Sequence, residues 1–342
     1  MPPKFPKGPL LPGDILVSNF NASSNVQGTG TTIIQYRPSP SGAVAGPPSN
    51  GTGANVFFQE NGQLPGLTLA LGVLQRGAIV VGIVNNNGTT AIGGPLLVLD
   101  RTGTPVQTIP VGGGSPLDTK INGPWGLAIA DHFSAASLFV SNVLDGTVTR
   151  LDVNVNVDGS GKLINLSVTR AMTIASGYGH KPDPTAFVLG PAGLAYEAAT
   201  DTLYVASEVD NAIYKVMNAS TRMGSNGTGT VFASGAKNKP TGGNNLRGPV
   251  GLTLAPNGHV IASNSDAVNG DPAHPSEIVE FTHDGQFVGE YNVNEAVGAA
   301  FGVAVGAFNP TDAFNSETTI FAAVNDVSNN MSVYALPIKH DQ

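Results

Sequence analysis

The sequence predicts an all-β fold, namely a six-bladed β-propeller of four-stranded antiparallel blades that forms a single domain over residues 1–342. Three observations support this prediction. The chain contains 44 Gly and 25 Pro but only 12% charged residues, a balance typical of short strands and tight turns rather than long surface helices. No segment carries a sustained apolar stripe of helical period. A strand-and-turn unit recurs along the chain.

The repeated unit is clearest from Leu189 to Tyr214, which reads LGPAGLAYEAATDTLYVASEVDNAIY. Short apolar runs alternate there with turns of Glu, Asp and Asn, which is typical of antiparallel strands. Each unit opens with a Gly followed by Leu or Val, and this anchor occurs at Gly66, Gly126, Gly193, Gly251 and Gly302. The spacing of roughly 50 to 70 residues suits one blade with loops of variable length.

The units follow one another from the first residues to the last. Residues 1–13 are Pro-rich and are expected to be irregular. In the first unit, the second to fourth strands are expected at Asp14–Asn19, Thr31–Tyr36 and Asn55–Glu60. The second unit is expected over residues 67–111. The later units are expected to end near Ser176, Ser234, Val293 and Leu336. The first unit lacks an inner strand and the sixth an outer one. Because an unpaired edge favours aggregation, we expect the N-terminal segment to lie beside the last unit and help to close the ring.

Charge and composition limit the partners. The net charge is −8 and the basic residues are scattered, so we expect no nucleic-acid partner. No apolar run is long enough for membrane insertion. The first residues have no apolar signal-peptide core, yet low Lys and abundant Asn, Thr and Gly favour an exported bacterial protein, periplasmic or secreted, with a cytoplasmic location left open. A closed ring needs no partner copy, so a monomer is expected.

The pattern Gly-Pro-x-Gly-Leu-Ala … Leu-Tyr-Val-Ala-Ser … Asn-x-Ile resembles the NHL-repeat family of six-bladed β-propellers, most closely over residues 122–293. Related propellers include the gluconolactonase and senescence-marker enzymes, peptidyl-hydroxyglycine lyases and streptogramin lyases. The resemblance implies the fold and leaves two functions open. The first is a binding or scaffold protein, and the alternative is a metal-dependent hydrolase or lyase. The first ranks higher because no catalytic set of these families is matched in full.

An up-and-down meander places the loops between the second and third strands on the same face as the loops that lead into the next unit. Long loops on a rigid scaffold are frequent binding sites. We therefore expect a small molecule, glycan or protein to bind this face, near the central channel. Its candidate residues are Asn19, Asn122, Trp125, Asn142, Asp183, Glu208, Asn264, Asp266 and Asn325.

A divalent cation such as Ca²⁺ is a possible cofactor, since Asn, Asp or Glu ends each second strand and hard cations prefer oxygen ligands. The candidate ligands are Asn122, Glu208 and Asp266. The competing interpretation, which we favour, is that these side chains cap turns. Ligands in the senescence-marker enzymes mostly precede the inner strands, and only Asn122 matches that position.

His180 and His274 are the candidate catalytic residues, because both lie in long loops of this face. Two imidazoles with a carboxylate could bind Zn²⁺, or one could act as general acid or base. The simpler alternative is two loop histidines that never meet. Trp125, the only tryptophan, could form the floor of a pocket or stack on a sugar ring, although such aromatic residues more often only pack within a blade.

Overall fold

The computed structural model describes residues 10–11, 13–37, 54–113, 117–235, 246–265, 277–293, 299–307 and 318–337. All regular elements in these ranges are strands, arranged as six antiparallel sheets and one separate hairpin. Within the same ranges there is no helix of the length and apolar character needed to cross a membrane.

Each sheet is a meander in which a strand pairs with the next strand along the chain. The first three sheets comprise β1 (Ile15–Ser18), β2 (Thr32–Tyr36) and β3 (Ala54–Gln59); β4 (Leu67–Val73), β5 (Ile79–Asn86), β6 (Ala91–Leu99) and β7 (Pro105–Ile109); and β8 (Pro124–Asp131), β9 (Ala135–Asn142), β10 (Thr147–Val157) and β11 (Leu163–Ser176).

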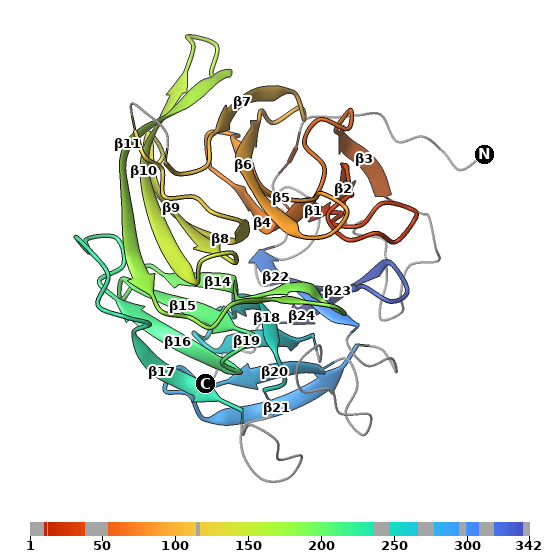
Figure 1. Ribbon diagram of the computed structural model, residues 1–342, viewed down its shortest axis with the longest axis vertical. Coiled ribbons are helices and arrows are strands. Elements are labelled where there is room, and N and C mark those ends of the chain that lie inside the picture. The colour runs from red at the N-terminus through yellow and green to blue at the C-terminus, as the bar shows by residue number, and fades with distance from the viewer. Residues whose placement is uncertain are drawn as a thin grey trace.

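The last three sheets continue the same order. They comprise β14 (Pro191–Glu197), β15 (Thr202–Ser207), β16 (Ala212–Met217) and β17 (Thr230–Ser234); β18 (Pro249–Leu254), β19 (Val260–Asn264), β20 (Glu277–Phe281) and β21 (Phe287–Asn292); and β22 (Ala300–Ala307), β23 (Thr318–Asn325) and β24 (Asn330–Pro337). The six sheets follow one another around a central axis, with β4, β8, β14, β18 and β22 innermost (Figure 1). The predicted six-bladed propeller is therefore confirmed.

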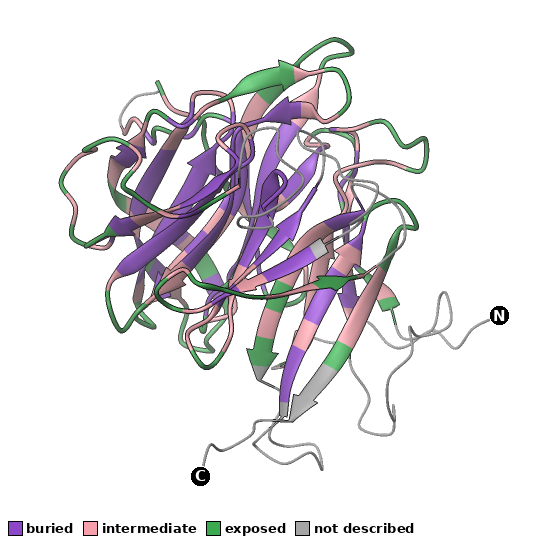
Figure 2. Ribbon diagram, turned by 90° about the horizontal axis from the view of Figure 1, so that it is seen from below, coloured by how far each residue is buried: buried purple, intermediate pink, exposed green. Residues whose placement is uncertain are grey.

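The hydrophobic core lies between neighbouring sheets rather than on the axis. The second strands carry most of it: Leu138, Phe139 and Val140 of β9 are fully buried, and so are the apolar residues of β15. The short apolar runs that follow the Gly anchors in the sequence predict a core on the inner strands, for example at Leu127 and Ile129. However, Leu127 and Ile129 are only partly buried, because inner strands have one neighbour fewer on the side of the channel. Figure 2 shows buried residues along the strands and exposed ones mainly in the turns.

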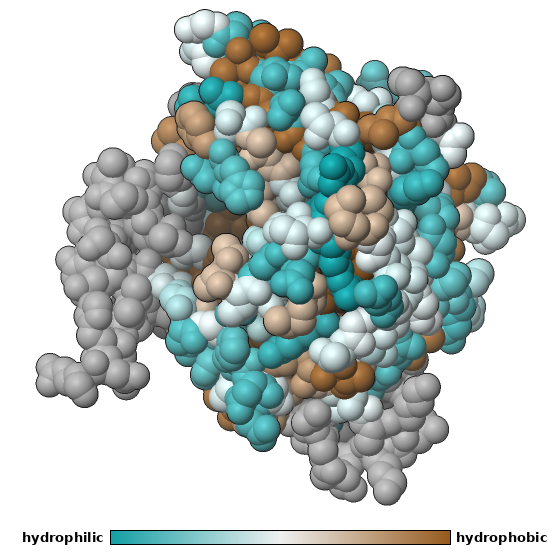
Figure 3. Space-filling model, turned by 90° about the vertical axis from the view of Figure 1, so that its left-hand side faces the viewer, coloured by the Kyte–Doolittle hydropathy of each residue, from teal (hydrophilic) through white to brown (hydrophobic). Residues whose placement is uncertain are grey.

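Polar residues dominate the outer face in Figure 3, where apolar residues form small separate groups. Isolated apolar residues of this kind are normal on a protein surface. This outer face therefore offers no obvious large apolar interface.

Strand β1 corresponds to a second strand, as the sequence predicts. The hydroxyl of Ser18 donates to Thr68 O (2.6 Å), just as the hydroxyl of Ser141, on second strand β9, donates to Ala192 O (2.7 Å) of the next inner strand. The first sheet thus has no inner strand among the described residues. Of the N-terminal segment, Leu10 donates its N–H to Arg101 O of the second sheet (2.8 Å), while residues 1–9 lie outside the described part.

A short hairpin of β12 (Lys181–Asp183) and β13 (Phe187–Leu189) stands where the sequence suggests only a long loop. It reaches the loop that follows β1: Gln27 Nε2 donates to Thr185 O (3.4 Å), and the Phe20 and Phe187 rings lie 6.2 Å apart. The hairpin, yellow-green in Figure 1, therefore covers part of one mouth of the channel.

Candidate functional site

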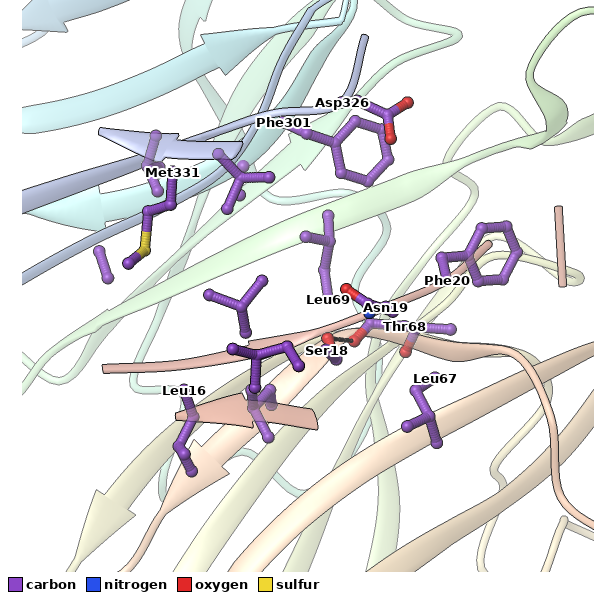
Figure 4. Close-up of a pocket in the computed structure, with 18 of the residues that line it drawn as sticks. Leu16, Ser18, Asn19, Phe20, Leu67, Thr68, Leu69, Phe301, Asp326 and Met331 are labelled. Carbon is purple, nitrogen blue, oxygen red and sulfur yellow. Dashed lines mark hydrogen bonds between the residues drawn. The ribbon is translucent and has the colours of Figure 1, made fainter. Parts of the chain in front are cut away.

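The central channel forms a cavity of about 1540 Å³. It is lined by β1 and by the inner strands of the other five sheets, and it extends into the seam between the first and last sheets. Figure 4 shows Leu16, Ser18 and Thr68 on one side of this space and Phe301 and Met331 on the other. A cavity at the axis of a rigid ring is a usual place for a small-molecule site.

One residue at or near the end of each second strand occupies an equivalent place, which we call the ring position. It is the residue whose N–H donates to the carbonyl of the residue that precedes the inner strand, as Val143 N does to Gly123 O (2.9 Å). The same bond occurs for Glu208 with Gly190 (3.2 Å). By alignment of the strands, the ring positions in chain order are Phe20, Val84, Val143, Glu208, Ser265 and Asp326.

The ring positions are apolar in three consecutive sheets and polar in the other three. The first three sheets supply Phe20, Val84 and Val143, whereas the last three supply Glu208, Ser265 and Asp326. Because the sheets are consecutive around the axis, the three polar residues lie on one continuous wall. All three line the channel.

Glu208 is the most perturbed acid of this wall. Its side chain is 3% exposed, and the Ser265 hydroxyl donates to its Oε1 (3.1 Å). Burial raises the pKa of Glu208 to about 8, because a carboxylate loses hydration in the interior. Burial also raises the pKa of Asp326. Two carboxyl groups with raised pKa values in a cavity are typical of functional sites.

An aromatic and apolar cluster also borders the channel. Trp125 is 3% exposed and packs edge-on against Phe20, with ring centroids 4.8 Å apart. The indole Nε1 is buried and has no hydrogen-bond partner. Val188 of the hairpin and Phe301 of β22 contact the same cluster. Trp125 therefore both packs against its neighbours and lines the channel.

Four of the predicted asparagines make hydrogen bonds that hold the loops. The Oδ1 atom of Asn142 accepts from Asn122 N (2.9 Å) and that of Asn264 from Arg247 N (3.0 Å). Asn325 Oδ1 accepts from Ser328 N (2.9 Å), and Asn19 Nδ2 donates to Thr32 Oγ1 (2.6 Å). These contacts fit the turn-capping interpretation. Asn19 and Asn325 also line the channel.

The remaining predicted residues make other contacts or lie outside the described part. Asn122 is exposed, and its Nδ2 donates to Asp145 Oδ2 (3.1 Å). Asp183 Oδ1 accepts from Thr185 N (2.9 Å) in the hairpin turn, and its charge lies near enough to Glu208 to contribute to the raised pKa of that carboxyl group. His180 is exposed, and its Nδ1 lies 3.2 Å from Tyr178 O. Asp266 and His274 lie outside the described residues.

The site residues chosen from the sequence include Glu208 but not Ser265 or Asp326, although Asp326 falls in a loop that the sequence assigns to the same face. Both residues could have been found by considering the position after each predicted asparagine, because Ser265 and Asp326 directly follow the strand-ending Asn264 and Asn325. Alternation along a strand turns successive side chains to opposite sides, so the Asn enters the blade and its successor meets the channel.

Within the described ranges, no group of three or more His, Asp or Glu side chains is arranged to hold a metal ion. The polar wall offers two carboxyl groups and a hydroxyl, which are hard oxygen donors of the type that Ca²⁺ and Mg²⁺ prefer. The donor type therefore suits such a cation, although further ligands would have to come from solvent or substrate.

The comparisons with known proteins do not show which function this chain has. No family model and no curated protein sequence matches the chain. Among solved structures, it is similar to a gluconolactonase from Xanthomonas campestris, with 15% identity over 91% of this chain and 81% of that one and a TM-score of 0.48.

Two further structures are similar. The calcium-binding protein regucalcin from Agrobacterium tumefaciens shows 12% identity over 80% of this chain and 91% of that one, with a TM-score of 0.41. Hydrazine synthase from Kuenenia stuttgartiensis shows 13% identity over 81% of this chain and 67% of that one, also with a TM-score of 0.41. Such identities concern the fold alone, so the function has to be argued from the channel.

Proposed function

We propose that this propeller binds an uncharged small molecule in its central channel and acts on it as a hydrolase or lyase, with Glu208 as the proton-exchanging group. The observation that supports this most is the polar wall, where Glu208, Ser265 and Asp326 occupy equivalent ring positions in three consecutive sheets. In the other three sheets the same position is apolar. If these residues only capped turns, there would be no reason for polar residues in three consecutive sheets and apolar residues in the other three.

The proton state of Glu208 suits a general acid. With its pKa raised to about 8, the carboxyl group retains its proton at neutral pH and can deliver it to a leaving oxygen. The Ser265 hydroxyl lies 3.1 Å from Oε1 of this carboxyl group. Ser265 thereby fixes the orientation of the acid and serves as a positioning residue.

Asp326 is the second carboxyl group of the wall. In its ionised form it would act as the general base, which accepts a proton from water in hydrolysis or from the substrate in elimination. The aromatic cluster of Phe20 and Trp125 would hold the apolar part of the ligand. An anionic ligand is disfavoured because the described lining residues of the channel include acids but no Lys, Arg or His.

A divalent cation on the polar wall is a second version of the same proposal. Glu208 and Asp326 would hold it through carboxylate oxygens and Ser265 through its hydroxyl, and the bound cation would supply charge stabilisation. Calorimetric titration with Ca²⁺ and Mg²⁺ distinguishes this version. Binding that is lost in Asp326→Asn supports it, whereas unchanged binding in that variant contradicts it.

The test of the function is a screen of uncharged lactones, esters and lyase substrates with the wild type and Glu208→Gln. The substitution keeps the shape and the acceptor for Ser265 but removes the proton. We expect kcat to fall about 100-fold or more, in line with the loss of a general acid. Wild-type kcat/KM should also fall above pH 8, where Glu208 loses its proton.

The matched control is Glu197→Gln, since Glu197 lies at the far end of β14 and its carboxylate is 3.6 Å from His283 rather than at the channel. This variant should keep wild-type kcat. Equal activity in Glu208→Gln and the wild type would refute the role of Glu208. If no compound is turned over or alters Trp125 fluorescence, the small-molecule proposal fails.

A further inference from the structure

A second, smaller hollow lies at the mouth of the channel beside the β12–β13 hairpin, and we call it the mouth pocket. Its volume is about 470 Å³, within the range of about 300 to 1,000 Å³ that is usual for small-molecule sites. Four segments border it, namely the loop after β1, the end of β5, the tip of the hairpin and the turn after β23. Its lining includes Asn25, Gln27, Asn86, Thr185, Phe187 and Asp326.

Contacts between these segments hold the walls of the mouth pocket in place. Asn86 Nδ2 donates to Gln27 O (2.8 Å), which joins the second sheet to the loop after β1. A Cβ on Gly28, whose φ is +74°, would lie 2.9 Å from Asn86 Cβ, so the two segments touch at a glycine. Gln27 Nε2 also donates to Thr185 O of the hairpin (3.4 Å). The pocket is therefore built by several elements rather than by one loop.

The lining presents polar groups that make no hydrogen bond within the described part of the chain. These groups are Asn25 Nδ2, Gln27 Oε1, Thr185 Oγ1 and the carboxyl group of Asp326. An amide nitrogen only donates, an amide oxygen only accepts, and a hydroxyl group does both. The mouth pocket thus offers donors and acceptors together, from three different segments.

Phe187 adds an aromatic surface to these polar groups. It is partly exposed, and its ring lies 6.2 Å from that of Phe20. Its φ of +67° lies in the left-handed region, which is unfavourable for a bulky side chain. Backbone conformations of this kind occur frequently at ligand sites, where the surrounding structure maintains them. The hairpin therefore holds this ring at the pocket despite a conformational cost.

A neutral ligand rich in hydroxyl groups matches this lining. Each hydroxyl donates and accepts, so adjacent hydroxyls on one ring can satisfy the amides and Thr185 together. An anion would meet the Asp326 carboxyl group and no Lys, Arg or His among the described lining residues. A purely apolar ligand would cover the polar groups without replacing their hydrogen bonds to water, which is unfavourable. Sugar rings combine such hydroxyls with a C–H face that packs on an aromatic ring.

We propose that the mouth pocket binds one sugar residue of a neutral oligosaccharide. Asn25, Gln27 and Thr185 form hydrogen bonds to its hydroxyl groups, and the Phe187 ring packs on its C–H face. Asp326 lines both the mouth pocket and the channel, so the next sugar of the chain lies toward the channel. This inference goes beyond the proposed reaction and does not depend on it, because a sugar can bind at the mouth without being turned over.

The probes are linear tetrasaccharides, namely cellotetraose, maltotetraose, mannotetraose and xylotetraose, titrated calorimetrically into the full chain. We expect at least one of them to bind saturably. Gln27→Ala should then weaken that binding at least tenfold, since the acceptor is lost and the only hydrogen bond of the side chain is a long one. Thr185→Val, which keeps the side-chain shape at an exposed turn position, should weaken it at least threefold. Phe187→Leu should weaken it at least fivefold because the flat ring is removed.

Gln286→Ala and Phe287→Leu are the matched controls. Gln286 lies in the exposed turn before β21, and Phe287 is 44% exposed on β21, so neither borders the mouth pocket. Both variants should bind the tetrasaccharide like the wild type. Thermal unfolding of all five variants verifies that each one is folded when binding is measured.

Three results would overturn the proposal. One is that none of the four tetrasaccharides binds to the wild type. Another is unchanged affinity in both Gln27→Ala and Thr185→Val, which would place the sugar elsewhere, such as in the channel. The third is equally tight binding of acetyl-tetra-alanine amide, which would show recognition of peptide amides rather than hydroxyl groups. Because equilibrium binding is measured, failure of catalysis by Glu208 would leave these outcomes unaffected.

Discussion

Glu208 combines near-complete burial with hydrogen bonds to neutral partners, the Ser265 hydroxyl and the Gly190 backbone. Burial of an unpaired carboxylate is costly, so the group stays protonated unless the pH rises well above the range of an exposed glutamate. The raised pKa of Glu208 therefore affects both the proposed chemistry in the channel and the pH dependence of folding stability.

Stability should therefore fall as the pH rises from about 5 to 9. The pKa of Glu208 is raised from 4.5 to about 8 in the folded state, so between these values the folded protein binds more protons than the unfolded chain. Its contribution is complete below the unfolded pKa and is lost as the pH passes through the folded one. The loss is on the order of 4 kcal/mol.

Denaturant unfolding at pH 5 and pH 9 measures this contribution. Glu208→Gln should lose much less stability over the same range because an amide does not titrate. Parallel pH profiles for the two proteins would contradict the raised pKa. Glu197→Gln serves as control and should keep the wild-type profile.

Asn142 and Asn122 offer a comparison of a buried and an exposed amide. Asn142 is fully buried, and its Nδ2 donates to Thr147 and Thr149 hydroxyls at 2.9 and 3.0 Å. Asn142→Ala should lower the free energy of unfolding by about 2 to 4 kcal/mol, because the buried partners lose their bonds. Asn122→Ala should cost less than about 1 kcal/mol. Equal losses in denaturant unfolding would contradict the structural role of Asn142.

At the scale of elements, the β12–β13 hairpin and the loop after β1 together cover the aromatic cluster. Phe20 packs on Trp125 from the loop, and Phe187 approaches Phe20 from the hairpin. Because the chain has a single tryptophan, its fluorescence reports on this contact alone.

Acrylamide quenching of Trp125 should be weak in the wild type, since the side chain is 3% exposed. Phe20→Ala should increase quenching several-fold by opening the indole to solvent, and should cost about 3 kcal/mol in stability. Phe287→Ala, on the outer strand β21 at 44% exposure, is the control. Strong quenching in the wild type would show that the cluster is open.

Strands were predictable from the sequence, but the site was predictable only in part. Period-two runs with Gly, Asp and Asn at their ends determined β8 to β10 and β14 to β16, because local turn chemistry fixes such elements. Asp326 was missed because its role depends on which side of a strand end faces the axis. The β12–β13 hairpin was missed because its Pro residues resemble those of an irregular loop.

At the scale of the whole molecule, the inner-strand glycines determine how closely the sheets approach one another. The same substitution should therefore have different effects around the ring. Gly126→Ala would drive a Cβ into Ala192 O and should destabilise the fold by 3 kcal/mol or more, on the order of other large core clashes.

Gly302→Ala should cost less than about 1 kcal/mol, because among the described residues the added Cβ meets only ordinary van der Waals contacts. Denaturant unfolding of both variants, with Gly251→Ala as a third, provides the test. Similar losses for Gly126→Ala and Gly302→Ala would mean that a backbone also packs closely on Gly302.

Among the described residues the first sheet has no inner strand, so the ring of described sheets has two ends. In a ring closed by strand pairing, each sheet has equivalent neighbours on both sides, but here the first and last sheets meet across an apolar space instead of a packed strand. Stability in a row of similar units depends on nearest-neighbour contacts, so the units at the ends are held least firmly. Thermal opening should thus begin at the β1–β3 and β22–β24 sheets and spread inward, so that the third and fourth sheets exchange their amide hydrogens last.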